Sequence, residues 1–175
     1  MSKLTQRPIL LLVSGAVLLV GCSDSPTGPA DAIPTIVALT PAAPPTTLFQ
    51  SLDVELDGSA SVEVDYWTPG GPRLRVISPE AATAHTVKLH QLRAASTYDF
   101  LVTPVGAGGA RGVASVGQFS TAPLPAALAA IQTNVVGQAT FPLLMMEVSL
   151  PSVTGVPIVM DRDGYIVWYR PGATA

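Results

Sequence analysis

The chain has 175 residues, of which 12% are charged and 6% are aromatic, and its formal net charge is −3. Nucleic-acid binding depends on clustered Lys and Arg that neutralise phosphate, so this acidic balance argues against a nucleic-acid partner. Hydrophobic residues make up 48% of the sequence, which is enough to form a core and argues against a disordered chain.

The first residues have the pattern of a secretory signal. A basic start precedes an apolar run from Ile9 to Val20, which is followed by Gly21 and Cys22. The run is shorter than the about 20 residues needed to cross a bilayer, and it has the basic, apolar and small-residue regions of a signal peptide. Its ending resembles the bacterial lipobox. That resemblance implies cleavage between Gly21 and Cys22 and diacylation of the Cys22 thiol; the alternative is an ordinary buried cysteine at the end of a membrane anchor.

Cys22 is the only cysteine of the chain, so neither an internal disulfide nor a cysteine-based metal site can form. Lipidation is the simplest explanation of this single thiol, and two or three acyl chains would anchor the chain durably. The expected partner is therefore a membrane, contacted through the N-terminal lipid. In bacterial lipoproteins an Asp directly after the cysteine favours the inner membrane, and Ser23 stands there instead. The resemblance thus implies the cell envelope, with the outer membrane favoured over the inner.

Residues 22–34 are rich in Pro, Gly, Ser and Asp without periodicity, which predicts a flexible tether. From 35 to 122, short alternating segments separated by turn residues predict an all-β fold, a seven-stranded antiparallel sandwich of the immunoglobulin or fibronectin type III kind. The predicted strands are Thr35–Thr40, Leu52–Asp57, Ser61–Trp67, Leu74–Val76, His85–Leu89, Tyr98–Thr103 and Val113–Phe119.

The strand that begins at Tyr98 gives this fold its clearest signature. Tyr98, Phe100 and Val102 alternate with more polar positions, which predicts that their side chains face a core. With Leu92 six residues earlier, the segment resembles the tyrosine corner of fibronectin type III domains, although Ala94 stands where Pro is usual. The resemblance implies that the Tyr98 hydroxyl bonds to upstream backbone.

Five carboxylates on the second and third predicted strands could be read as a calcium site or as catalytic acids: Asp53, Glu55, Asp57, Glu63 and Asp65. Calcium needs six to eight oxygens that converge from loops, and these residues occupy the outward phase of their strands. We therefore expect solvated surface charge.

The two histidines do not form a metal site either. His85 and His90 are five residues apart, so on one strand they point to opposite faces, and we expect both to be exposed near a strand end. The loop Gly106–Gly112 lacks the third glycine of a nucleotide-binding motif and predicts a hairpin loop. No catalytic residue, metal site or cofactor is predicted.

Residues 123–175 are predicted to form a linker and an incomplete β segment. A short helix or turn is expected at Ala126–Ile131, strands at Phe141–Ser149, Gly155–Met160 and Tyr165–Tyr169, and a hairpin turn at Asp161–Gly164. Met145 and Met146 are expected to fill a core.

Residues 157–169 (PIVMDRDGYIVWY), together with the preceding sandwich, resemble the N-terminal part of bacterial arylsulfotransferases, in which a β-sandwich leads into a β-propeller. The resemblance implies that the chain is the non-catalytic N-terminal fragment of such an enzyme. Members of that family transfer a sulfuryl group between phenols through a histidine in later propeller blades, so the chain is expected to be inactive alone. The alternative is a self-contained lipoprotein module that binds a carbohydrate or protein, with Trp67 and Trp168 as exposed contact residues.

Overall fold

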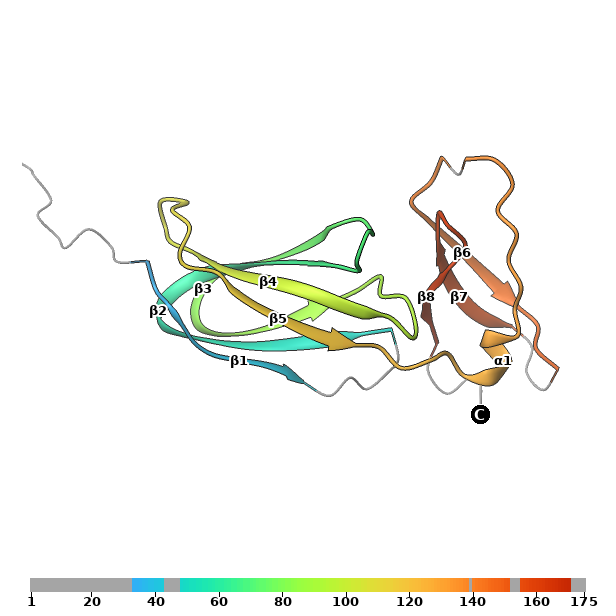
Figure 1. Cartoon of the computed structure of the whole chain (residues 1–175), viewed down its shortest axis with the longest axis horizontal. Helices are drawn as coiled ribbons and strands as arrows, with labels where there is room; N and C mark the ends of the chain where they lie inside the picture. Colours follow the sequence, from blue (N-terminus) through green and yellow to red (C-terminus); the bar gives the residue numbers. More distant parts are fainter. Residues whose placement is uncertain (1–32, 43–47, 139, 152–154, 171–175) are drawn as a thin grey trace, which may run out of the picture. The chain divides into compact units, whose positions relative to one another are not determined.

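The computed structural model describes residues 33–42, 48–138, 140–151 and 155–170. The predicted signal segment and its Gly21–Cys22 cleavage site lie outside these residues. The described part is all-β with antiparallel pairing throughout, apart from the short helix α1 (Ala126–Ala129), which confirms the predicted fold class (Figure 1). No helix in the described ranges has the length and apolarity to span a membrane.

The larger sheet contains five strands in the order β1-β2-β4-β5, and β3 also pairs with β2. These strands are β1 (Ile36–Ala42), β2 (Gln50–Trp67), β3 (Leu74–Leu89), β4 (Thr97–Val105) and β5 (Ser115–Ser120).

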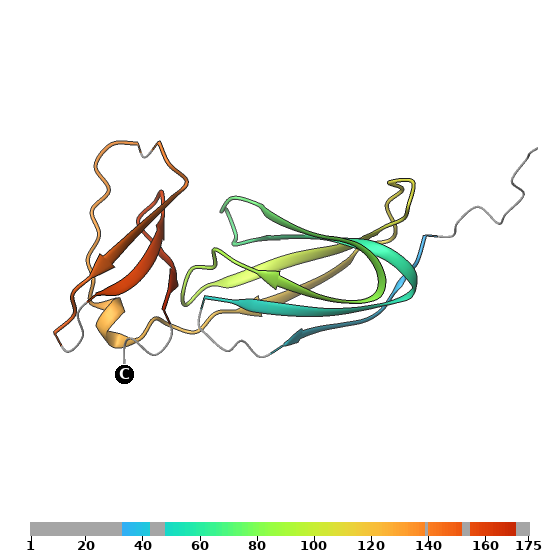
Figure 2. The ribbon, with the colours of Figure 1, turned by 180° about the vertical axis from the view of Figure 1, so that it is seen from behind.

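Two long strands account for the difference between seven predicted strands and five observed ones. β2 joins the predicted segments at 52–57 and 61–67, and β3 joins those at 74–76 and 85–89. The pairing of β2 with β3 shifts register between Glu55 and Val62, an irregularity of the kind that bends strands. Figure 2 shows the two strands curving together at this place. The bend gives a three-segment layer (β1, first half of β2, second half of β3) and a four-segment layer (first half of β3, second half of β2, β4, β5).

Inward-facing side chains from both layers form the sandwich core. The predicted alternation of Tyr98, Phe100 and Val102 is confirmed, because all three are buried while Asp99 and Leu101 are partly exposed. Full burial of a large apolar side chain contributes about 1.5–3 kcal/mol, so this row is a main source of stability.

The smaller sheet has the order β6 (Leu143–Val148), β7 (Val156–Asp161) and β8 (Ile166–Tyr169). One face of β7 packs in a second core with Leu128 of α1. The predicted turn between β7 and β8 is confirmed: Gly164 N–H donates to Asp161 O at 3.0 Å, and Gly164 has a φ of +86°, which glycine adopts without strain.

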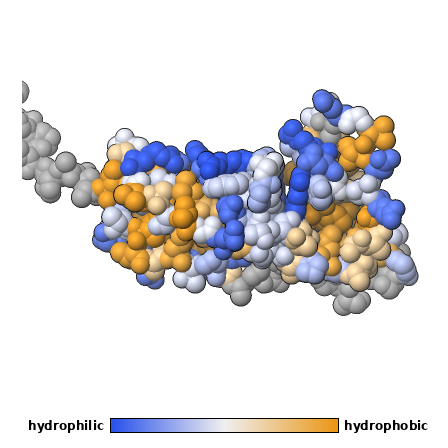
Figure 3. All heavy atoms as spheres, in the orientation of Figure 1, coloured by the Kyte–Doolittle hydropathy of each residue, from blue (hydrophilic) through white to orange (hydrophobic). Residues whose placement is uncertain are grey.

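The expectation that the methionine pair fills a core is wrong. Met145 is 69% exposed and Met146 37% exposed. Both lie on β6, which is an edge strand, so less of the chain covers their side chains. Figure 3 shows hydrophobic surface in this C-terminal part of the chain.

The loop between β4 and β5 is the predicted hairpin loop. Gly106 N–H donates to Ala110 O, Val105 bridges to Arg111, and Gly109 has a φ of +78°. These backbone contacts close the loop as a β-hairpin.

Candidate functional site

The tyrosine corner is present. The Tyr98 hydroxyl accepts a hydrogen bond from the backbone N–H of Arg93 at 2.7 Å, and the Tyr98 ring stacks on Phe119 with centroids 5.3 Å apart. Leu92 is fully buried beside it. Burial raises the pKa of the Tyr98 hydroxyl, so the group stays protonated. The corner therefore fixes the backbone of Arg93.

Thr121 fixes Arg93 a second time, from the end of the sandwich. Its hydroxyl donates to the Arg93 carbonyl at 2.6 Å and accepts from the Ser96 N–H at 3.0 Å. With both backbone polar groups of Arg93 engaged, its side chain starts from a defined position.

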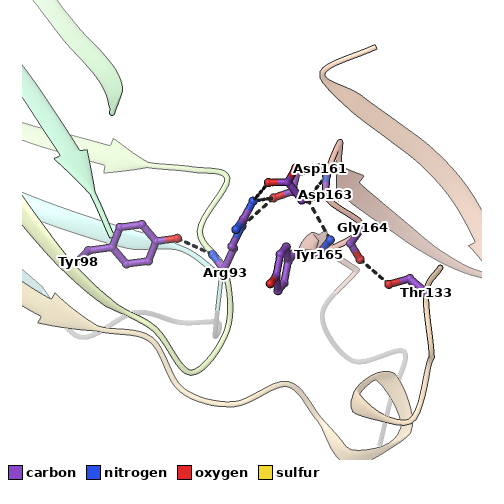
Figure 4. A network of polar contacts seen from close by, with 7 residues as sticks. All are labelled: Arg93, Tyr98, Thr133, Asp161, Asp163, Gly164 and Tyr165. Carbon is purple, nitrogen blue, oxygen red and sulfur yellow. Dashed lines mark hydrogen bonds and ion pairs between the residues drawn. The ribbon is translucent and has the colours of Figure 1, made fainter. Parts of the chain in front are cut away.

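That side chain reaches the turn between β7 and β8 (Figure 4). Arg93 Nε donates to Asp161 Oδ2 at 2.8 Å, and Nη2 pairs with Asp163 as well. The guanidinium also lies 3.9 Å from the centre of the Tyr165 ring, the geometry of a cation–π contact. We call Arg93, Asp161, Asp163 and Tyr165 the Arg93 clamp.

The turn is shaped to receive the arginine. The second oxygen of Asp161 accepts the backbone N–H groups of Asp163 and Tyr165, each at 3.0 Å, so this carboxylate is bonded on both sides. Burial alone would lower the pKa of Arg93, but the hydrogen bonds that it donates to Asp163 and Asp161 outweigh burial and raise that pKa. The four side chains of the Arg93 clamp thus pair with one another. This arrangement is suited to holding the tyrosine corner and the β7–β8 turn together.

A cavity of about 420 Å³ lies beside the clamp, with Gln91, Arg93, Tyr98 and Asp161 in its wall. Its ionisable groups are Tyr98 of the corner, the clamp residues Arg93, Asp161 and Asp163, and Arg162. Within the described ranges, no group of three or more His, Cys, Asp and Glu side chains is placed to hold a metal ion.

Of the five carboxylates expected on the surface, three are exposed, Glu63 is half-buried and Asp65 is buried. Asp65 is 4% exposed and forms a two-pronged ion pair with Arg75, with Nε–Oδ1 at 2.7 Å and Nη2–Oδ2 at 2.9 Å. The arginine hydrogen bond lowers the pKa of Asp65. β2 lies between β3 and β4 at this position, so even an outward-phase side chain is covered. Glu63 extends the network by pairing with Arg75 and Arg111.

The expectation for the histidines is wrong at His85, which is 7% exposed, while His90 is exposed. His85 lies inside the long strand β3 on its inward phase. Its Nδ1 lies 2.9 Å from Ser78 Oγ and its Nε2 2.9 Å from Ala60 O. The ring thus bridges the bend of the sandwich, with Nε2–H donating to the Ala60 carbonyl.

The two tryptophans differ. Trp168 is 43% exposed, as expected. Trp67 is half-buried, because the Arg73 guanidinium lies 4.0 Å from the centre of its ring.

Sequence reasoning missed the Arg93 clamp. The partners are 68 and 70 residues apart, so no local period connects them. The sequence does show an arginine directly after Leu92 and an acidic turn at Asp161–Gly164. Only the tertiary fold determines that these two features come into contact.

No family model and no curated protein matches the chain. Among solved structures, it is similar to a family 76 glycoside hydrolase from a bovine Bacteroides thetaiotaomicron strain, with 16% identity and a TM-score of 0.43 over 52% of this chain and 21% of that one. It is also similar to the third fibronectin III domain of human KIAA0343 protein, with 17% identity and a TM-score of 0.40 over 59% of this chain and 94% of the domain. The match thus spans about a fifth of the hydrolase.

Proposed function

We propose that this chain is a lipid-anchored, non-catalytic β module of the bacterial cell envelope. The anchor would be the acylated Cys22, as the lipobox resemblance and the lack of any other cysteine suggest. Ser23 after it favours the outer membrane. The sandwich would then act as a spacer that carries the C-terminal sheet.

The observation that carries this proposal is the Arg93 clamp. Its ion pairs and cation–π contact join the tyrosine corner to the β7–β8 turn, so the two sheets are held by specific contacts as well as by the chain. A spacer that must present a second unit in a defined position needs such a junction. A linker alone would let the C-terminal sheet reorient freely.

The more specific form of the proposal is that the module supports an arylsulfotransferase-like enzyme. Residues 157–169, which resemble the opening blade of those propellers, form β7, the turn and β8. Sulfuryl transfer between phenols would then be the work of further propeller blades, and the chain would be inactive alone.

A second candidate function is a self-contained binding or adhesion module for a carbohydrate or protein. One observation favours it: Met145, Val159 and Trp168 are in register across the C-terminal sheet, with Met145 and Trp168 exposed. Exposed apolar rows of this kind are typical of interaction surfaces.

Metabolic labelling with an alkyne fatty acid in a bacterial host tests the anchor. We expect label and membrane fractionation for the wild type and for the matched control Ser23→Ala, and loss of both for Cys22→Ala. An unprocessed, unlabelled N-terminus in intact mass spectrometry would overturn the anchoring role.

A second assay tests the non-catalytic role. The purified chain is incubated with 4-nitrophenyl sulfate and phenol, and release of 4-nitrophenolate is followed. We expect none above the protein-free rate. Turnover by the chain unaided would refute the proposal.

A further inference from the structure

An open cleft of about 550 Å³ lies between the segment that follows α1 and one face of the sheet at β6 and β7. The volume falls in the range of about 300–1,000 Å³ that small-molecule sites occupy. Its walls are largely apolar and come from Ile131, Val135, Phe141, Leu144, Met146 and Met160. Trp168 pairs with Val159 and therefore lies on the opposite face of the sheet, away from the cleft.

The pairing register of β6 and β7 shows which side chains form the apolar wall of the cleft. Leu144 pairs with Met160, and Met146 pairs with Ile158, so these four side chains share the face that carries the second core. Met160 and Ile158 are buried there, whereas Leu144 and Met146 remain 37% exposed towards the cleft. A ligand that covered them would gain about 25 cal/mol per Å² of apolar surface, and methionine adapts readily to a ligand's shape.

The charge in the cleft comes from Arg162. Its side chain has no hydrogen-bond or ion-pair partner among the residues the structure describes. Asp161 also lines the cleft, but one of its oxygens is bonded to Arg93 and the other to two backbone N–H groups. Arg162 is therefore the charged side chain of the lining that has no partner among the described residues.

The outer wall of the cleft is attached to the β7–β8 turn. Thr133 donates from Oγ1 to Gly164 O at 3.0 Å, and a Cβ at Gly164 would lie 2.9 Å from Val135. The segment thus packs closely against the turn at one end, and this contact keeps the apolar wall in place.

We propose that this cleft binds a small amphipathic carboxylate, with an acyl chain along Leu144 and Met146 and a negatively charged headgroup at Arg162. The side-chain amides of Gln132 and Asn134, which also line the cleft, supply further N–H donors to the headgroup. This is a non-covalent ligand site, and it is independent of acylation at Cys22.

Calorimetric titration of dodecanoate into the full chain carrying Cys22→Ser tests the site without the covalent lipid. We expect saturable binding with a Kd of roughly 10–100 μM. Met146→Gln, in the wall, should weaken it about fivefold or more, whereas the matched control Met145→Gln, on the opposite face of the same strand, should leave it unchanged.

The charge is tested separately with Arg162→Gln and the matched control Arg170→Gln. We expect Arg162→Gln to weaken dodecanoate about threefold to fivefold, the size of an exposed ion pair, without affecting 1-dodecanol. The control should bind both as the wild type does. The proposal fails if binding is absent, if the two methionine variants behave alike, or if dodecyltrimethylammonium binds as tightly as dodecanoate. Circular dichroism of each variant confirms that it is folded.

Discussion

Replacing Arg93 by Gln should loosen the C-terminal sheet while the sandwich stays folded. The substitution removes the guanidinium but keeps the backbone N–H that Tyr98 accepts and the carbonyl that Thr121 bonds. Asp161 and Asp163 would then lose their cationic partner. The tyrosine corner should survive, so the effect should concentrate on the β7–β8 turn.

The magnitude follows from the exposure of each contact. The Asp161 pair is the more buried, with 16% and 23% of the two side chains exposed, and a hydrogen bond to a charged group is worth about 1.5–3 kcal/mol. The Asp163 carboxylate is 52% exposed, so solvent screening reduces its pair to about 0–1 kcal/mol. The stacking on Tyr165 adds about 0.5–1 kcal/mol. Because Asp161 keeps its two backbone donors, we expect a net loss of about 2 kcal/mol in the free energy of opening.

Native-state hydrogen exchange measures this loss residue by residue. Amides of β7 and β8 should exchange about 30-fold faster in Arg93→Gln, and those of β4 should change little. Arg170→Gln, which removes the same charge from an exposed side chain directly after β8, is the matched control. In a double-mutant cycle with Asp161→Asn, the coupling energy should be about 1–2 kcal/mol. Equal exchange in Arg93→Gln and Arg170→Gln, or zero coupling, would show that the clamp does not hold the sheet.

Three further outcomes are expected. The hydrogen bond from Arg75 lowers the pKa of Asp65 in the folded chain. This ion pair therefore stabilises the fold above the ordinary pKa of 3.8, and its contribution is lost as the pH falls below that value. Urea unfolding of Asp65→Asn should accordingly show a shallower loss of stability between about pH 4 and pH 2 than the wild type does. Burial raises the pKa of Tyr66 from 10.0 to about 12, so the contribution of this residue to folding stability is complete below pH 10.0 and is lost as the pH rises through about 12. In an ultraviolet titration, one tyrosine of the wild type should ionise at a higher pH than any tyrosine of Tyr66→Phe. Gly117→Ala would place a Cβ against the Phe100 ring and should destabilise by about 1–3 kcal/mol in thermal or urea unfolding, while Gly108→Ala, where nothing lies within 4 Å, should be nearly neutral.

The sandwich was predictable because its signals are local. Alternation around Tyr98 identifies a half-buried strand, and Leu92 six residues earlier identifies the corner. The merging of predicted strands into β2 and β3 was not predictable, because a bend within a continuous strand and a turn between two strands leave similar breaks in the alternation. Glu55 to Val62 is such a break, and the structure resolves it as shifted pairing.

The errors at single residues have a common physical cause. Alternation predicts the phase of a side chain but not what covers each face. Asp65 is in the outward phase and is buried because Arg75 folds over it, and His85 is buried because the strand continues through its position. Met146 is on the core phase and is still partly exposed, because β6 has no neighbour on one side.

The length of β2 has a consequence for how the domain comes apart. A single unbroken strand pairs with β1, β3 and β4 and belongs to both layers. Neither layer can then unfold while the other stays folded, because unfolding either one disrupts a strand that the other also contains. A protease challenge should accordingly leave the sandwich either whole or fully digested, with no long-lived half-domain fragment.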